Sequence, residues 1–104
     1  MSQREWKEVD IELLAFIERV GSSLVKLDLL DFFARNPYTR DTSANIALRI
    51  GRDKEAVALE LYDLYLMGFL ERERLNNTFV YRLSPDKKTR EMATKAIRKL
   101  NALK

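Results

Sequence analysis

The chain has 104 residues, with 19 Lys and Arg against 16 Asp and Glu, and it contains neither cysteine nor histidine. The missing cysteines exclude disulfides, zinc–thiolate sites and iron–sulfur clusters. The missing histidines remove the commonest general base near neutral pH and the commonest transition-metal ligand. No segment reaches the ~20 apolar residues of a membrane helix, and the polar N-terminus lacks the pattern of a secretory signal. We therefore expect a cytoplasmic protein with no cofactor, no metal site and no catalytic residue.

The net charge of +3 is distributed unevenly. Residues 86–104 carry seven basic and two acidic side chains, a net charge of +5, whereas residues 24–70 carry six basic and seven acidic ones, a net charge of −1. A basic surface favours anionic partners such as nucleic acid, although lysine and arginine are also common near the end of an exposed helix. The charge alone therefore indicates a cationic C-terminal segment and assigns no function.

Apolar side chains at helical spacing predict a first helix over residues 8–20 and a second over residues 24–35. Ser23 can cap the second helix, and Pro37 stops it because the residue before a proline avoids the helical conformation. Residues 38–42 are expected to form a polar connection. The buried face of the second helix is expected to carry Leu27, Leu30, Phe33 and Ala34.

Two further helices are predicted, each with a polar cap. Thr42 precedes a short helix that ends at Gly51, and Asp53 caps a helix over residues 53–67. The spacing of apolar residues predicts the inward faces of both helices. These faces carry Ile46, Ala47 and Ile50 in the shorter helix, and Val57, Leu61 and Leu64 in the longer one.

Residues 70–83 change to the alternation that is typical of β-strands. Asn76 and Asn77 separate the two halves of this segment, and asparagine tolerates the positive φ that a two-residue turn requires. A turn at these residues places Glu71 opposite Arg82, which brings opposite charges side by side. The segment is therefore predicted to be a β-hairpin.

A last helix is predicted over residues 86–103. The fold class is accordingly mainly α with a small β-hairpin (α+β). Because the polar breaks are too short to be interdomain linkers, we expect a single domain over residues 1–104.

Residues 24–83 resemble the winged helix-turn-helix domain of ArsR- and MarR-type regulators. In that resemblance residues 53–67 are the recognition helix and residues 70–83 the wing, flanked by an N-terminal helix (8–20) and a C-terminal helix (86–103). The alternative is a small helical bundle with a hairpin. The motifs that carry the resemblance are Thr42-Ser43-Ala44-Asn45-Ile46-Ala47, with Asn45 in place of the usual glutamate, Arg49-Ile50-Gly51, Gly68-Phe69-Leu70-Glu71-Arg72 and Phe79-Val80-Tyr81-Arg82-Leu83-Ser84.

The resemblance implies a transcriptional regulator that binds double-stranded DNA with its recognition helix in the major groove and its wing on the DNA backbone or minor groove. The DNA-facing positions that it implies are Arg40, Thr42, Ser43, Arg52, Lys54, Glu55, Ala58, Arg72, Arg74, Asn76 and Asn77.

The resemblance also implies a homodimer formed by the outer helices. The alternative is that these helices pack within one chain. The residues expected at the dimer interface are Val9, Leu13, Phe16, Met92, Ala96, Ile97, Leu100 and Leu103.

The predicted recognition helix is poor in side chains that read DNA bases. Glu60 and Asp63 add negative charge that repels phosphates. Leu59, Tyr62 and Leu66 form an apolar stripe away from the predicted core face. Either an outer helix covers this stripe or a protein partner binds it. Two functions therefore stay open: a DNA-binding regulator, and a winged-helix interaction module that does not bind DNA specifically. An enzyme is not expected.

Overall fold

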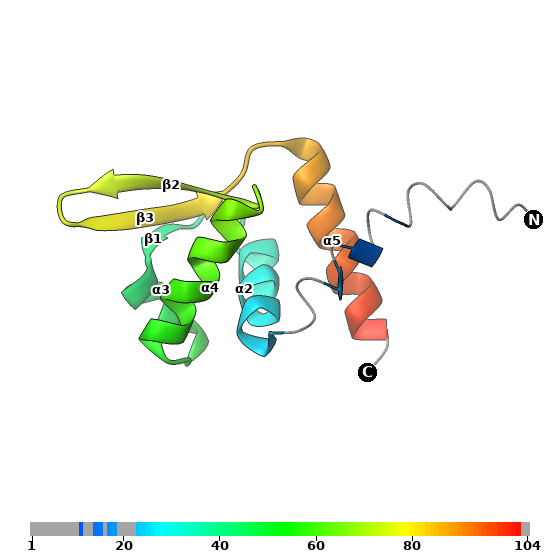
Figure 1. The fold of residues 1–104 in the computed structure, drawn as a ribbon, viewed down its shortest axis with the longest axis horizontal. Coiled ribbons are helices and arrows are strands. Elements are labelled where there is room, and N and C mark those ends of the chain that lie inside the picture. Colours follow the sequence, from blue (N-terminus) through cyan, green and yellow to red (C-terminus); the bar gives the residue numbers. More distant parts are fainter. Residues whose placement is uncertain (1–10, 12–13, 16, 19–22, 103–104) are drawn as a thin grey trace, which may run out of the picture.

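The computed structural model describes residues 11, 14–15, 17–18 and 23–102 (Figure 1). Most of the predicted first helix, with Val9, Leu13 and Phe16, lies outside the described residues, as do Leu103 and the side chain of Leu100. The elements in chain order are α2 (Leu24–Arg35), β1 (Arg40–Thr42), α3 (Ser43–Ile50), α4 (Lys54–Leu66), β2 (Leu70–Leu75), β3 (Thr78–Leu83) and α5 (Lys87–Ala102).

The predicted polar caps begin three of these helices. The side-chain oxygens of Ser23, Thr42 and Asp53 accept hydrogen bonds from backbone N–H groups three residues later, at 3.0–3.2 Å. Each bond satisfies a donor that has no partner inside its helix. Gly51 ends α3 with a φ of +71°, the left-handed conformation that favours glycine. Local sequence therefore fixes the starts of α2, α3 and α4.

The sheet has three antiparallel strands in the order β1–β3–β2. The predicted hairpin register is confirmed, since Glu71 lies opposite Arg82 and Leu75 opposite Thr78. Asn76 adopts a φ of +59° at the turn. The prediction of a polar connection over residues 38–42 was wrong, because Arg40–Thr42 pairs with β3. These three polar residues show no alternation of apolar and polar side chains that would predict a strand. Their extended conformation is evident only from the pairing with β3.

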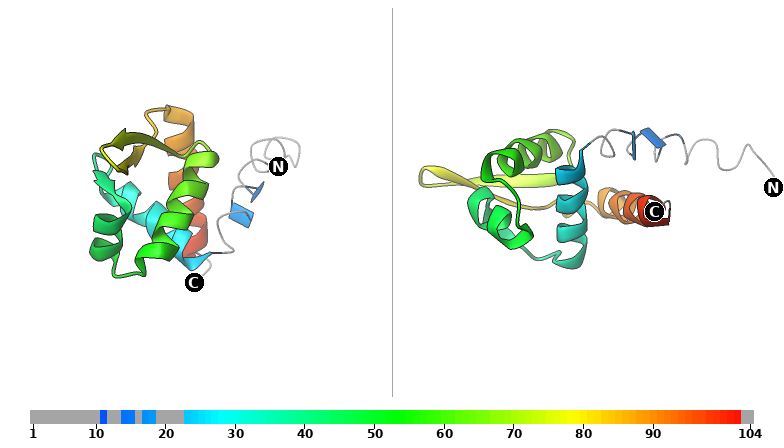
Figure 2. Two further views of the ribbon diagram at one scale, coloured as in Figure 1. Left: turned by 60° about the vertical axis from the view of Figure 1, so that its left-hand side comes forward. Right: turned by 90° about the horizontal axis from the view of Figure 1, so that it is seen from below.

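The hydrophobic core lies between the sheet and the helices, with α2, α3 and α4 on one side of the sheet and α5 packed against α2 (Figures 1 and 2). The predicted inward face of α4 is confirmed, because Val57, Leu61 and Leu64 are completely buried. In α3, Ile46 and Ala47 are buried as predicted, whereas Ile50 is only partly buried against the core.

The predicted face of α2 was partly wrong. Ala34 is exposed and Leu27 half-buried, whereas Leu29 and Phe32 are buried. The helix contacts α3, α4 and α5. It therefore buries a wider surface than the single stripe of a one-sided helix.

Candidate nucleic-acid interface

The helix-turn-helix is formed by α3 and α4, joined by the short turn at Gly51. β1 leads directly into the first of these helices, and the hairpin β2–β3 extends away from the helices as a wing (Figure 2). Lys54 and Glu55 are exposed at the start of α4, and Asn76 and Asn77 are exposed at the tip of the wing. The predicted DNA-facing positions therefore divide between the start of the helix-turn-helix helices and the wing.

Ion pairs occupy two of the predicted DNA-facing arginines and a third arginine on the wing. Arg40 pairs with Glu73, Arg52 with Asp28 and Arg82 with Glu71, at N–O distances of 2.5, 2.7 and 2.9 Å respectively. All of these side chains are at least one-third exposed. The carboxylates reduce the positive charge that these arginines present, so phosphate contacts through them compete with existing partners.

Arg72 lies within a cluster of aromatic rings between α4 and the wing. Its guanidinium carbon is 4.0 Å from the ring centroid of Phe79, 4.5 Å from that of Tyr65 and 5.0 Å from that of Tyr62. A hydrogen bond to the hydroxyl of Tyr81 raises the pKa of Arg72 above its ordinary value. Cation–π contacts of this kind hold the guanidinium against the rings. Arg72 thus packs the wing against α4.

Lys54 and Arg74 are exposed and have no carboxylate partner within the described part of the chain. Nε of Arg74 donates only to the backbone oxygen of Asn76, at 3.4 Å. Their charges are therefore uncompensated, one at the start of α4 and one near the tip of the wing. Thr42, Ser43 and Ala58 are half-buried.

A buried ion-pair network joins α2 to α4. Lys26 is only 6% exposed, and its Nζ lies 3.3 Å from Oε1 of Glu60 and also bonds Oδ2 of Asp63. Ser23 donates from Oγ to Oε2 of the same glutamate at 2.9 Å. Glu60 and Asp63, which were expected to repel DNA, both contact Lys26 of α2, which compensates one of their two negative charges. Their effect on DNA stays a prediction. The only signal in the sequence is that the two acids flank the Val57–Leu61–Leu64 face.

The apolar stripe on α4 is accessible. Leu59 is 68% exposed, Tyr62 41% and Leu66 58%. Scattered exposed leucines are common, but three along one helix leave a continuous apolar strip. Exposure of Tyr62 is what the interaction-module alternative requires.

Three residues of α5 that were expected at a dimer interface already pack, in whole or in part, within the chain. Ala96 is completely buried, and Ile97 is partly buried against the core. Met92 is half-buried. In this conformation Ala96 has no surface for a second copy, and the interface stays a prediction.

Two negative findings apply to the described residues. No three of their acidic side chains gather closely enough to hold a metal ion. None of their helices combines the length and the apolar character needed to cross a bilayer.

No protein-family model and no curated protein sequence matches the chain. Solved structures do match. The antimony-specific transcriptional repressor AntR has a TM-score of 0.64 at 22% identity, covering 98% of this chain and 85% of that one. The homodimeric winged helix-turn-helix domain of Mb0332 from Mycobacterium bovis, a possible ArsR-family regulator, has a TM-score of 0.63 at 20% identity, covering 100% and 92%. YusO from Bacillus subtilis has a TM-score of 0.61 at 17% identity, covering 97% and 73%.

At these identities the likeness concerns the fold. The chain has the winged helix-turn-helix fold seen in structures of ArsR- and MarR-type regulators, mainly α with a three-stranded antiparallel sheet. The predicted resemblance and fold class are thereby confirmed.

Proposed function

We propose that this chain is a DNA-binding transcriptional regulator of the cytoplasm. One observation carries the proposal: the helix-turn-helix α3–α4 and the wing each present an exposed cation, Lys54 and Arg74, that has no carboxylate partner among the described residues. Two separated cations beside a helix start and a wing tip suit phosphate groups that lie along a duplex. The fold supports this reading by analogy, since a fold alone does not assign a function.

In the proposed DNA interface, the predicted cationic residues have different roles. Lys54 and Arg74 bind phosphates directly. Arg40 and Arg52 exchange their carboxylates for phosphates on binding, which costs part of the affinity gained. Arg72 acts by holding the wing in place. This division predicts binding that depends strongly on salt and weakly on base sequence, because phosphate contacts position a protein without reading bases.

We further propose that the active form is a homodimer. The Mycobacterium bovis domain is described as homodimeric, and Met92 and Ile97 leave part of their surface on α5 accessible. A symmetric pair of wings would address half-sites about 34–36 Å apart. Because the chain contains no cysteine or histidine, a metal-sensing site built on those ligands does not carry over to it.

Fluorescence anisotropy with a labelled duplex, titrated at low and then moderate ionic strength, tests the proposal. Lys54→Ala and Arg74→Ala should each weaken binding to all sequences and each lower the salt slope by about 1. Lys95→Ala, which removes an exposed cation from α5, is the matched control and should change neither the DNA affinity nor the salt slope. Failure of the unmodified chain to bind a duplex at low ionic strength would overturn the proposal.

A second candidate function is an interaction module that uses the apolar stripe of α4. The exposure of Leu59, Tyr62 and Leu66 favours it. In this case the chain binds no duplex even at low ionic strength, and Leu59→Ser with Leu66→Ser abolishes binding of a hydrophobic dye without changing stability. The same double variant should leave DNA affinity unchanged if the first proposal holds.

A further inference from the structure

A small pocket lies where the base of the wing meets the start of α5. Its volume is about 220 Å³, and it is lined by side chains from three elements and from the loop before β1. Three of the lining residues are arginines, and none is acidic. The lining residues that matter here are Tyr38, Arg40, Arg82 and Arg90, with Pro37 and Pro85 beside them.

The sheet register brings two of these arginines together. Arg40 on β1 and Arg82 on β3 are direct partners across the two strands. Like charges placed opposite each other in a sheet repel, so this pairing is unfavourable unless anions compensate it. Glu73 and Glu71 on β2 provide part of that compensation, although neither lines the pocket.

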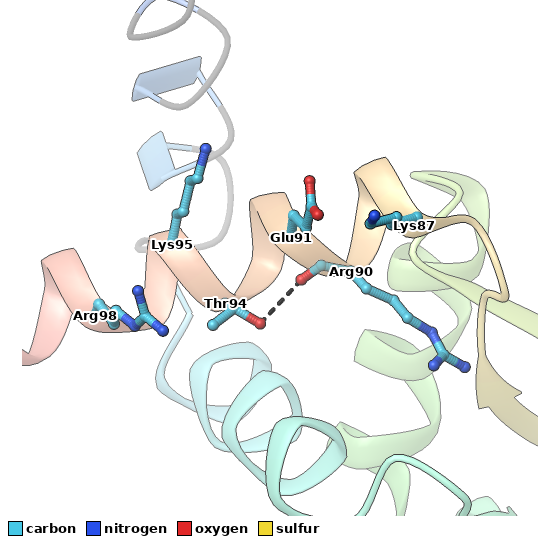
Figure 3. Close-up of a pocket in the computed structure, with 6 residues that line it drawn as sticks. All are labelled: Lys87, Arg90, Glu91, Thr94, Lys95 and Arg98. Carbon is cyan, nitrogen blue, oxygen red and sulfur yellow. Dashed lines mark hydrogen bonds between the residues drawn. The ribbon is translucent and has the colours of Figure 1, made fainter.

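The third arginine comes from α5. Figure 3 labels Arg90 among six side chains of α5 and shows its side chain extending away from the helix toward the strands. Its Nε donates to the backbone oxygen of Ser84 at 2.7 Å, which fixes the guanidinium at the pocket. Both Nη atoms of Arg90 have no partner among the described residues.

Donors also remain on the two strand arginines. Arg40 uses Nη2 for Glu73, and Arg82 uses Nε and Nη2 for Glu71. Each therefore keeps Nη1 without a partner in the described residues. The ion pairs hold the guanidinium groups in place before any ligand arrives, which lowers the entropy lost on binding. The three arginines meet only two carboxylates, so one positive charge is left over.

We propose that this pocket binds a small oxyanion, a phosphate or carboxylate group on an organic molecule. Guanidinium groups bind such groups through parallel N–H bonds, and phosphate and carboxylate share this chemistry. The volume fits the anionic group and a small organic part. Tyr38 is 90% exposed at the rim, and its ring can pack on that part of the ligand.

The position of the pocket makes it a regulatory site. A bound oxyanion contacts β1, which leads into α3, β3, which forms the wing, and the first turns of α5. It therefore couples the wing base to the outer helix. The regulatory role rests on the proposed DNA binding, whereas anion binding by the pocket does not, because the three arginines line it in the single chain.

The test is an NMR titration of the full chain with inorganic phosphate, with chloride adjusted to hold the ionic strength constant. The Nε–Hε signals of Arg40, Arg82 and Arg90 should shift together and saturate. Arg90→Gln should weaken binding about tenfold or more, as expected for loss of a charged hydrogen-bonding partner. Arg98→Gln removes the same charge from the same helix, lies outside the pocket and should leave the affinity unchanged.

Arg40→Gln is a second pocket variant in case Arg90→Gln disturbs α5, and it should weaken phosphate binding similarly. Shifts that never saturate, or an equal loss in Arg98→Gln, would identify an adventitious ion only and overturn the proposal. A parallel titration with acetate separates a phosphorylated ligand from a carboxylate, since the better-fitting group should saturate at lower concentration. If a DNA duplex shifts the Arg90 signal and neither small anion does, the pocket belongs to a DNA interface and the proposal fails.

Discussion

Arg82 and Glu71 face each other across the wing and form an ion pair that the register of the hairpin creates. Nε and Nη2 of the arginine donate to Oε1 of the glutamate at 3.1 and 2.9 Å. Both side chains are about half exposed. Exposed pairs of this kind contribute little to stability, typically about 0–1 kcal/mol. Their main effect is to favour one register over its one-residue slips.

Charge reversal tests this pair. Glu71→Arg places an arginine opposite Arg82, which already faces Arg40 on its other side, and should lower the free energy of unfolding by about 1 kcal/mol. Adding Arg82→Glu restores an opposite-charge pair and should recover most of the loss. Urea denaturation of the unmodified chain, both single variants and the double variant gives the coupling free energy between residues 71 and 82. Simple addition of the two single effects would show that the pair does not interact.

Removal of the buried lysine should have a larger effect. Lys26→Met leaves the carboxylates of Glu60 and Asp63 without their shared cation at the α2–α4 contact. Breaking a buried pair costs about 3–5 kcal/mol, and partial exposure of the two acids reduces this to about 2–3 kcal/mol. Arg35→Met on the same helix breaks an exposed pair with Asp31 and should cost under about 1 kcal/mol. If urea denaturation showed the same loss of unfolding free energy for Lys26→Met and Arg35→Met, the buried network would be contradicted.

Substitution of Arg72 should loosen the wing. Arg72→Leu keeps an apolar side chain among the rings but removes the cation–π contacts and the hydrogen bond to Tyr81, at a cost of about 1–2 kcal/mol. We expect the substitution to accelerate amide hydrogen exchange in β2 and β3 and to leave exchange in α2 unchanged. Arg74→Leu, two residues along the same strand and without a cation–π contact to these rings, is the control. Unchanged exchange in the wing of Arg72→Leu would show that other contacts hold it.

The start of α5 should respond to acid. Hydrogen bonds from the Thr89 hydroxyl and then from its backbone N–H hold the pKa of Asp86 below its ordinary value of 3.8. Since the folded-state pKa is the lower one, the ionised carboxylate stabilises the fold above the ordinary value. This contribution is lost as the pH falls through the folded-state pKa. Asp86→Asn should therefore flatten the dependence of stability on pH below about 4, as thermal melts across pH 2–6 would show. An unchanged profile would assign the acid response to other carboxylates.

Local sequence determined the starts of three helices, the face of α4 and the hairpin register. Caps such as Thr42 and Asp53 act within three residues, and the pairing of Glu71 with Arg82 follows from a turn of two residues. The resemblance of the motifs to winged helix-turn-helix domains was also readable, because they occur in order within about sixty residues. Such features depend on neighbours in the chain, so the chain alone reveals them.

Tertiary structure decided which charged side chains are available to a partner. Lys26 reaches Asp63, 37 residues away, Arg40 pairs with Glu73 across the sheet, and Arg72 lies among rings from two elements. The sequence shows these residues only as charges at helix or strand positions. Ion pairs and cation–π contacts act over a few ångströms, and only packing brings residues that are distant in sequence within that range. The +3 net charge came from the sequence, but the fold decides where it is compensated.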